Sequence, residues 1–312
     1  MKPRVNIIIC TYNNKEIIDK VLLSVENQTY KNFDCTIIDD NSSDGIGRYV
    51  QEFFPRVKFV GKTSNTGPSE SRNLGVNLTR GKYIATVDSD VELSRDFLQK
   101  MVRFMEADSK IGISASKILY SKDKKTINSA GGTMTRAGIG KNLGEGKSRR
   151  SFEKKNGVFY APSAAMVVRR DILGRVGGFD DAYFYGHEDT DLGWRVNLAG
   201  YKVMYNPDAV AYHDVSRTIS KEPEMVAFNG VKNRIRSILK NYEGLNALKY
   251  GALYGLLLGG DIVLHRNRIQ KIKAVFWNIG HIADTLRERK RVQRTRKVDD
   301  EKLFGLFDAG LF

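Results

Sequence analysis

The sequence predicts an α/β protein with a mainly parallel central sheet, helices on both faces of that sheet, and a helical extension at the C-terminus. In residues 5–93, short apolar β-prone runs alternate with segments of helical spacing, which is the pattern of repeated βαβ units. The first run, residues 5–10, is almost continuously apolar, as expected for a strand that is covered on both faces. The last hundred residues show helical spacing alone.

Each element follows from its local pattern. In the first part of the chain, we expect strands at residues 5–10, 34–38, 57–60 and 83–87 and helices at 16–28, 49–54, 70–78 and 95–107. Further along, we expect strands at 111–114, 117–120, 158–168, 201–205 and 210–213 and helices at 171–176, from 188 or 189 to just before Gly200, and at 225–242, 245–264 and 269–286.

Polar residues follow three of the predicted parallel strands, where ligands bind in sheets of this kind. They are Thr11, Tyr12, Asn13, Asp39, Asp40, Asp88 and Asp90. Two aspartates one residue apart at a strand end need a compensating cation, donor or water, and Mg²⁺ and Mn²⁺ prefer such oxygen ligands. The glycine-rich fingerprint of dinucleotide sites and the phosphate-binding loop of P-loop ATPases are absent from the sequence, which argues against those two enzyme classes.

The order and spacing of these motifs resemble the inverting family 2 glycosyltransferases, and in particular a rhamnosyltransferase-like subgroup. The similarity covers about residues 3–242, including the run that holds Ser71, Arg72 and Asn73. It implies a GT-A fold and a nucleotide-diphosphate sugar, most simply UDP- or dTDP-linked, as donor. It also implies that the donor lies against Thr11, Tyr12, Asn13, Asp39, Asp40, Arg72 and Asp88.

A second acidic cluster, Glu188, Asp189 and Asp191, opens the helix predicted from residue 188 or 189. The helix dipole alone accounts for one or two of these acids. Attack by a hydroxyl on an anomeric carbon needs a base on the face opposite the leaving diphosphate, and this second set of carboxylates can supply it. The resemblance assigns the base to Asp189.

The resemblance also assigns two further groups of residues. The acceptor side is expected to hold Glu188, Asp191, Trp194 and Arg195. The expected metal ligands are Asp88, Asp90 and His213, with Mn²⁺ or Mg²⁺ as the ion. A nitrogen ligand favours Mn²⁺.

We expect a catalytic domain over residues 1–214, with a nucleotide-binding half at about 1–92 and an acceptor half at 93–214. The basic helical extension would occupy residues 215–312. Residues 133–156 are rich in Gly, Lys and Arg and are either a surface loop or a lid over bound substrate.

The formal net charge of +15 indicates an anionic partner. Seven of the eleven residues from 287 to 297 are basic, and they follow apolar helices, a combination that resembles an interfacial membrane attachment. The apolar stretch at 250–260 is too short to span a bilayer. We therefore expect a cytoplasmic protein, peripheral on the inner face of the plasma membrane, that acts on a glycan or a lipid-linked acceptor.

One alternative stays open for the C-terminal extension, and two stay open for the function. The helices at the C-terminus would otherwise pack on the catalytic domain or form a homodimer, and the apolar residues at 303–307 and 311–312 would insert or dimerise. The first alternative function is nucleic-acid binding through the basic C-terminus. The sequence lacks an aromatic and basic stacking platform, so we expect no nucleic acid as partner. The second alternative function is that of a sugar-phosphate nucleotidyltransferase on a similar α/β scaffold.

Overall fold

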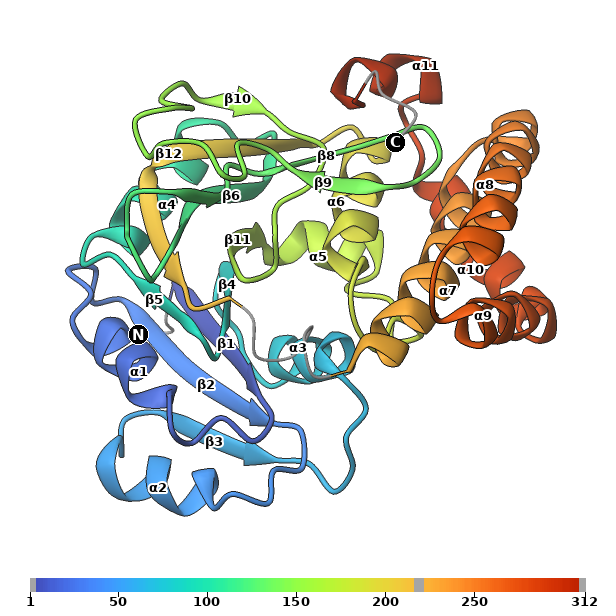
Figure 1. Ribbon diagram of the computed structural model, residues 1–312. Coiled ribbons are helices and arrows are strands. Elements are labelled where there is room, and N and C mark those ends of the chain that lie inside the picture. Colours follow the sequence, from blue (N-terminus) through green and yellow to red (C-terminus); the bar gives the residue numbers. More distant parts are fainter. Residues whose placement is uncertain (1–3, 216–221, 309–312) are drawn as a thin grey trace.

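The computed structural model of the chain describes residues 4–215 and 222–308 and confirms the predicted α/β class (Figure 1). The main sheet runs in the order β10-β12-β6-β11-β4-β1-β2-β3. The strands on this path are β1 (Val5–Thr11), β2 (Phe33–Asp39), β3 (Lys58–Gly61), β4 (Tyr83–Asp88), β6 (Ile111–Tyr120), β10 (Asn156–Gly157), β11 (Ala165–Arg169) and β12 (Lys202–His213). Two short strands lie off this path: β5 (Val91–Leu93) pairs with β12, and β7 (Ile127–Ser129) pairs with β6.

The helices fall into two groups. Those of the α/β part are α1 (Ile18–Glu26), α2 (Ile46–Phe53), α3 (Pro68–Asn77), α4 (Phe97–Ala107), α5 (Arg170–Val176) and α6 (Glu188–Leu198). Those of the C-terminal part are α7 (Pro223–Asn241), α8 (Gly244–Leu264), α9 (Arg268–Gly280), α10 (Ile282–Thr295) and α11 (Asp300–Leu303), followed by the 3-10 turn η1 (Phe304–Leu306). Figure 1 shows α7–α10 gathered on one side of the α/β part.

The position of the candidate site follows from the strand order. Strands β3, β2, β1 and β4 are parallel neighbours, and the chain leaves β1 toward β2 but returns from β3 to the opposite side of β1. The carboxyl ends of β1 and β4 therefore flank the point where the strand order reverses, which is where open α/β sheets bind ligands.

Alternating side chains of the strands divide the core into two layers. Ile7 and Ile9 pack with residues of α1, α2 and α4, whereas Ile8 packs with residues of α5 and α6 on the other face. The prediction of helices on both faces is thus confirmed at the level of single residues.

Several predicted boundaries were wrong. The runs at 111–114 and 117–120 form one strand, β6, and those at 201–205 and 210–213 form one strand, β12, with a register shift between Asn206 and Val210. Of the run at 158–168, only the end becomes a strand, as part of β11. The predicted helix at 269–286 is two helices, because the chain breaks around Gly280 and His281.

The segment at 133–156 is partly regular. It pairs β8 (Gly132–Met134) with β9 (Gly140–Asn142), and Arg149 donates its backbone N–H to the carbonyl of Lys125. A lid function for this segment stays a hypothesis.

The C-terminal helices share a core with the α/β part. Phe159 and Trp194 pack in one buried cluster with Tyr242 of the segment after α7 and with Leu303 of α11. The apolar residues at 303–307, which we expected to insert or dimerise, instead pack on this cluster; Leu311 and Phe312 lie outside the described residues. The expected division at residue 214 therefore separates two stretches of sequence that are joined by one core.

Buried ion pairs attach α7 to the loop before α6 and to α6 itself. Lys240 of α7 lies 2.5 Å from Asp180 and 2.9 Å from Asp191, and Arg236 bonds Asp180 at 2.9 Å. Arg195 completes the network with a 2.8 Å bond to Asp191. These charges hold the pKa of Asp180 and of Asp191 below the ordinary range against the opposing effect of burial. Helix α6 is therefore fixed to the C-terminal part by charge as well as by packing.

Replacing Lys240 with Met should destabilise the protein by about 3 kcal/mol, because two buried carboxylates lose a partner. Urea unfolding measures this loss, and Lys249→Met, which removes an exposed lysine nearby, is the matched control and should change little. An equal effect of the two substitutions would show that the network adds no stability.

Candidate active site

The strand register brings the first predicted residues together. Thr11 pairs with Asp39 across β1 and β2, and Cys10 pairs with Asp88 across β1 and β4. Asn14 Nδ2 donates to Ser89 Oγ at 2.8 Å, which ties the loop after β1 to the loop that holds Asp88 and Asp90. The three polar loops thus meet at one edge of the sheet, as predicted.

Arg72 links this edge to the second acidic cluster. Its side chain, which α3 places inside the protein, bonds Asp88 Oδ1 through Nη2 and Glu188 Oε1 through Nη1, both at 2.8 Å. A buried guanidinium is stable only with such charge-assisted partners. Two carboxylates that are 100 residues apart in the sequence therefore belong to one site.

Asp189 follows Glu188 in the first turn of α6, which begins at Glu188 as predicted. Its Oδ2 accepts a hydrogen bond from the backbone N–H of Ser163 at 3.3 Å, and its Oδ1 accepts one from the N–H of Thr190 at 2.6 Å. Ser163 also donates its hydroxyl to Glu188 Oε1 at 3.1 Å. Ser163 is also fixed to the sheet, because Thr86 Oγ1 of β4 donates to the Ser163 carbonyl at 2.7 Å.

Two groups at the site have shifted acidity. Burial, together with the negative charge of Glu188, raises the pKa of Asp189 to about 7. Burial also raises the pKa of Tyr185 to about 12, and the carboxylates of Glu188, Asp88, Asp90 and Asp189 add to this effect. Sequence reasoning missed Ser163 as an anchor of Asp189, and it missed Tyr185 altogether; the position of Tyr185 just before the acidic cluster was the available signal.

Asp90 and His213 form the expected pair on the metal side. His213 Nε2 lies 3.3 Å from Asp90 Oδ1, and His213 Nδ1 lies 3.2 Å from Asn128 Oδ1 on β7, which orients the ring. Burial opposes protonation of the ring, but the carboxylates of Asp90, Asp88 and Asp214 raise the pKa of His213.

The oxygen of Asp90 and the ring nitrogen of His213 fit a divalent ion that takes its remaining ligands from phosphate and water. Among the described residues, no group of three or more His, Cys, Asp or Glu forms a metal site on its own. However, the buried Oδ1 of Asp90 faces Nε2 of His213 at 3.3 Å and has no other hydrogen-bond partner in the described residues, so it can serve as a ligand. Mg²⁺ and related ions in phosphate-binding sites commonly take one or two protein ligands and fill the remaining positions with phosphate oxygens and water.

Other residues predicted to contact the nucleotide already have partners in the protein. Asp40 accepts bonds from Lys62 at 2.7 Å and from the N–H groups of Thr66 and Gly67, so it holds the loop before α3. Asp39 accepts from Ser42. Asn13 Oδ1 accepts from the N–H of Ser43 at 2.9 Å.

Thr11 and Tyr12 are better placed for a ligand. Thr11 Oγ1 is buried and has no hydrogen-bond partner in the described residues. The Tyr12 side chain is 48% exposed, so its ring is available for stacking.

All four residues predicted for the acceptor side are buried; Glu188 is 5% exposed and bonds Arg72. Asp191 and Trp194 are fully buried and Arg195 is 2% exposed. Asp191 and Arg195 belong to the ion network with α7. Trp194 packs edge-on against Tyr242, with the two ring centroids 4.6 Å apart. These three residues have no exposed surface for an acceptor, and we assign them to the positioning of α6.

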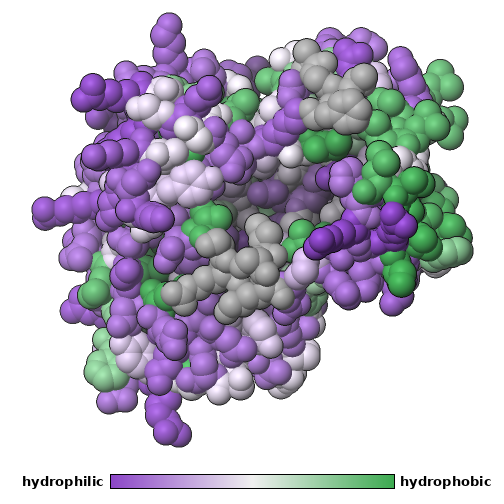
Figure 2. All heavy atoms as spheres, viewed as in Figure 1, coloured by the Kyte–Doolittle hydropathy of each residue, from purple (hydrophilic) through white to green (hydrophobic). Residues whose placement is uncertain are grey.

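The space-filling view shows a hollow near the middle of one face, with hydrophilic residues in it (Figure 2). A separate open hollow lies at the turn between α8 and α9, lined by Glu224 and residues 264–270.

Replacing Arg72 with Met should destabilise the protein by about 3 kcal/mol, since Glu188 and Asp88 lose their shared cation. Urea unfolding gives the magnitude, and Arg80→Met, at an exposed position of the same part of the chain, is the control. Arg72→Lys should restore only part of the stability, because one ammonium group lacks the fork that reaches both carboxylates. Full stability of Arg72→Met would contradict a bridging role.

Residues 6–177, more than half of the chain, match the family described as Glycosyl transferase family 2. The chain is 31% identical over 132 residues to an uncharacterized glycosyltransferase of Haemophilus influenzae, which covers 41% of each protein. It is 25% identical over 216 residues to the pre-mycofactocin glycosyltransferase of Mycobacterium tuberculosis, which covers 67% of this chain and 42% of that protein. The chain spans less than half the length of these curated relatives.

Two solved structures share the fold. GalNAc-T7 with UDP, GalNAc and Mn²⁺ aligns over 90% of this chain and 57% of its own, with a TM-score of 0.64 at 14% identity. The mannosyltransferase PcManGT from Pyrobaculum calidifontis, in complex with GDP-Man and Mn²⁺, aligns over 99% of this chain and 89% of its own, with a TM-score of 0.56 at 16% identity. The fold is thus of the GT-A type, and the chain belongs to glycosyl transferase family 2.

Proposed function

We propose that this chain is a metal-dependent inverting glycosyltransferase that moves a sugar from a nucleotide-diphosphate sugar to a hydroxyl of a glycan or lipid-linked acceptor. The observation that carries the proposal is the bridge from Asp88 through Arg72 to Glu188, which brings the Asp90–His213 pair and Asp189 to one site. The names of the structural neighbours, which include nucleotide sugars, UDP and Mn²⁺, support it.

On the donor side, Asp90 and His213 are the proposed ligands of Mn²⁺ or Mg²⁺. Such an ion, when bound, neutralises negative charge on the leaving diphosphate. Arg72 engages Oδ1 of Asp88, so Oδ2 is the oxygen that we propose for contact with the donor or the ion. Thr11 and Tyr12 would line the nucleotide, and Asp39 lies beside Thr11 in the strand register.

On the acceptor side, Asp189 is the proposed base. The attacking hydroxyl is a weak nucleophile, so a carboxylate must take its proton as the new bond forms. The N–H groups of Ser163 and Thr190 orient the carboxylate, and its raised pKa makes it a stronger base than an ordinary aspartate. Attack from the face opposite the diphosphate inverts the anomeric carbon.

The identity of the donor is the open part of the proposal. A panel of UDP-, dTDP- and GDP-linked sugars, tested by thermal shift with Mn²⁺, separates the bases, because a ligand that binds the folded state raises its stability. We expect a UDP- or dTDP-linked sugar to give the largest shift.

Replacing Asp189 with Asn should lower the rate of transfer by about 10²–10⁴-fold, because the amide cannot accept the proton. Donor binding, measured by thermal shift, should stay close to that of the unaltered protein. Asp181→Asn, at an exposed aspartate nearby, is the control and should keep most of the activity. Transfer by Asp189→Asn at the full rate would rule out this base.

The pH profile of kcat/KM should show an acidic limb near pH 7. Burial and Glu188 raise the pKa of Asp189, so the base is protonated and inactive at lower pH and becomes ionised as the pH rises. Glu188→Gln removes the neighbouring negative charge and should move the limb to lower pH. A limb near the ordinary value of an aspartate, about 4, in the unaltered protein would contradict the assignment.

Removal of divalent ions with EDTA should abolish transfer, and added Mn²⁺ should restore it. His213→Ala should raise the Mn²⁺ concentration needed for half-maximal activity, because one ligand is lost. His281→Ala, at an exposed histidine of α10's N-terminal boundary, should leave that concentration unchanged. Full activity in EDTA would exclude the metal role.

A further inference from the structure

We propose that α8, α9 and α10 present one docking surface for an anionic lipid bilayer, and that these helices lie in the interface of the bilayer without crossing it. The α8–α10 apolar face consists of exposed large apolar residues on these three helices. They are Leu245, Leu248, Leu256, Val263, Leu264, Ile269, Ile272, Phe276, Ile279, Ile282 and Leu286.

The face is a concentration of apolar surface that ordinary exposure does not explain. These residues are eleven of the sixteen large apolar side chains that are exposed in the described part of the chain. Leu256 is 78% exposed and Phe276 is 67% exposed. Figure 2 shows hydrophobic residues gathered at the side of the molecule where Figure 1 places α8 and α9. Contiguous apolar patches of this kind mark protein or membrane contacts.

The opposite sides of the same helices are anchored to the protein. Tyr250 and Tyr254 of α8 are buried, and Arg234 of α7 donates to the Tyr254 hydroxyl at 3.3 Å. Asn278 of α9 donates to the carbonyl of Lys232 at 3.1 Å, and Arg289 of α10 donates to the carbonyl of Tyr242 at 2.7 Å. Each helix therefore has one face on the protein and one face without a partner in the described residues.

Helix α8 contains the apolar stretch at 250–260, which by itself is too short to span a bilayer. Among the described residues, α8 is the one helix that is long and apolar enough to cross a membrane by length and composition. Only 22% of its most apolar 18-residue segment is buried in the protein, so most of that segment is open to a partner. Crossing would nevertheless detach Tyr250 and Tyr254 from their partners, so we infer an interfacial position.

The charge around the face favours anionic lipid. Residues 244–298 contain twelve lysines and arginines and three acids, a net charge of +9 out of +15 for the whole chain. The stripe of α10 that begins with the apolar residues Ile282 and Leu286 continues into the exposed residues Lys290 and Arg294. Apolar insertion with adjacent basic side chains is the chemistry by which interfacial helices bind anionic membranes.

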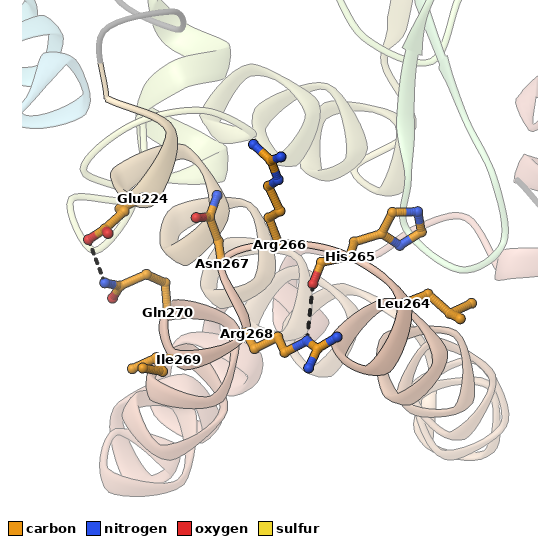
Figure 3. Close-up of a pocket in the computed structure, with 8 residues that line it drawn as sticks. All are labelled: Glu224, Leu264, His265, Arg266, Asn267, Arg268, Ile269 and Gln270. Carbon is orange, nitrogen blue, oxygen red and sulfur yellow. Dashed lines mark hydrogen bonds between the residues drawn. The ribbon is translucent and has the colours of Figure 1, made fainter.

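The turn between α8 and α9 shows the same combination at close range (Figure 3). Leu264 and Ile269 lie at the two sides of the turn, with Arg266 and Arg268 between them. Gln270 donates to Glu224 of α7 at 2.7 Å, which secures the turn to the rest of the protein.

A second copy of the chain is the competing occupant of the face. Two copies meeting here would bring two strongly positive surfaces together, and that repulsion opposes a dimer while it favours a negatively charged bilayer. The charge therefore decides between the two occupants.

The test is co-sedimentation of the full chain with vesicles, either of phosphatidylcholine alone or of an equimolar mixture with phosphatidylglycerol. We expect binding to the mixed vesicles, weaker binding to the neutral ones, and release of the bound protein by alkaline carbonate. Leu256→Glu combined with Phe276→Glu should lower partitioning at least about tenfold. Lys290→Glu combined with Arg294→Glu should lower it by about tenfold or more on the mixed vesicles alone.

Matched controls lie on the α/β part. Leu23→Glu combined with Phe53→Glu replaces exposed apolar residues there, and Lys20→Glu combined with Arg56→Glu reverses exposed basic ones. Both controls should bind like the unaltered chain, and unchanged thermal unfolding shows that all variants fold. The binding assay needs no donor or acceptor, so its result is independent of the proposed activity.

Three outcomes would overturn the proposal. The first is no binding to mixed vesicles, or an equal loss in the control variants. The second is a dimer in solution that Leu256→Glu with Phe276→Glu dissociates, without lipid binding. The third is resistance to alkaline carbonate, which would mean that α8 crosses the bilayer.

Discussion

The site depends on one buried cation. The guanidinium of Arg72 bonds Asp88 at the end of β4 and Glu188 at the start of α6, and the pair of bonds fixes the distance between the two acidic clusters. Without it, the buried carboxylate of Glu188 would lose its cation and face the half-buried carboxylate of Asp88, which is unfavourable. Because the bridge forms within the protein, the two sides of the candidate reaction centre are aligned before any substrate binds.

Helix α6 is held from both ends of its acidic turn. Glu188 faces Arg72 and the sheet, whereas Asp191 faces Lys240 and α7. Asp189 lies between these two anchors, so the C-terminal helices contribute to the position of the proposed base. A surface on α8–α10 that binds lipid would thus be connected through α7 to α6 by packed and hydrogen-bonded residues.

The sequence predicted the elements of the first hundred residues well, because strand and helix spacing there is regular and each strand ends in polar residues. It also predicted the start of α6 at Glu188 and the proximity of His213 to Asp90. It did not separate exposed from buried charge. Asp191 and Arg195, which we expected on the acceptor side, are buried, and so are three basic residues of α7: Lys232, Arg236 and Lys240. Their burial depends on partners far away in the sequence, which spacing within one helix cannot reveal. For the same reason, the sequence did not reveal that the N–H and hydroxyl of Ser163 bond Asp189 and Glu188.

A crystal structure of the Asp189→Asn variant with a nucleotide-diphosphate sugar and Mn²⁺ would test the arrangement most directly. We expect the diphosphate and the ion beside Asp90 and His213, with the free face of the anomeric carbon turned toward residue 189. A sugar turned away from residue 189, or an ion bound far from Asp90, would contradict it.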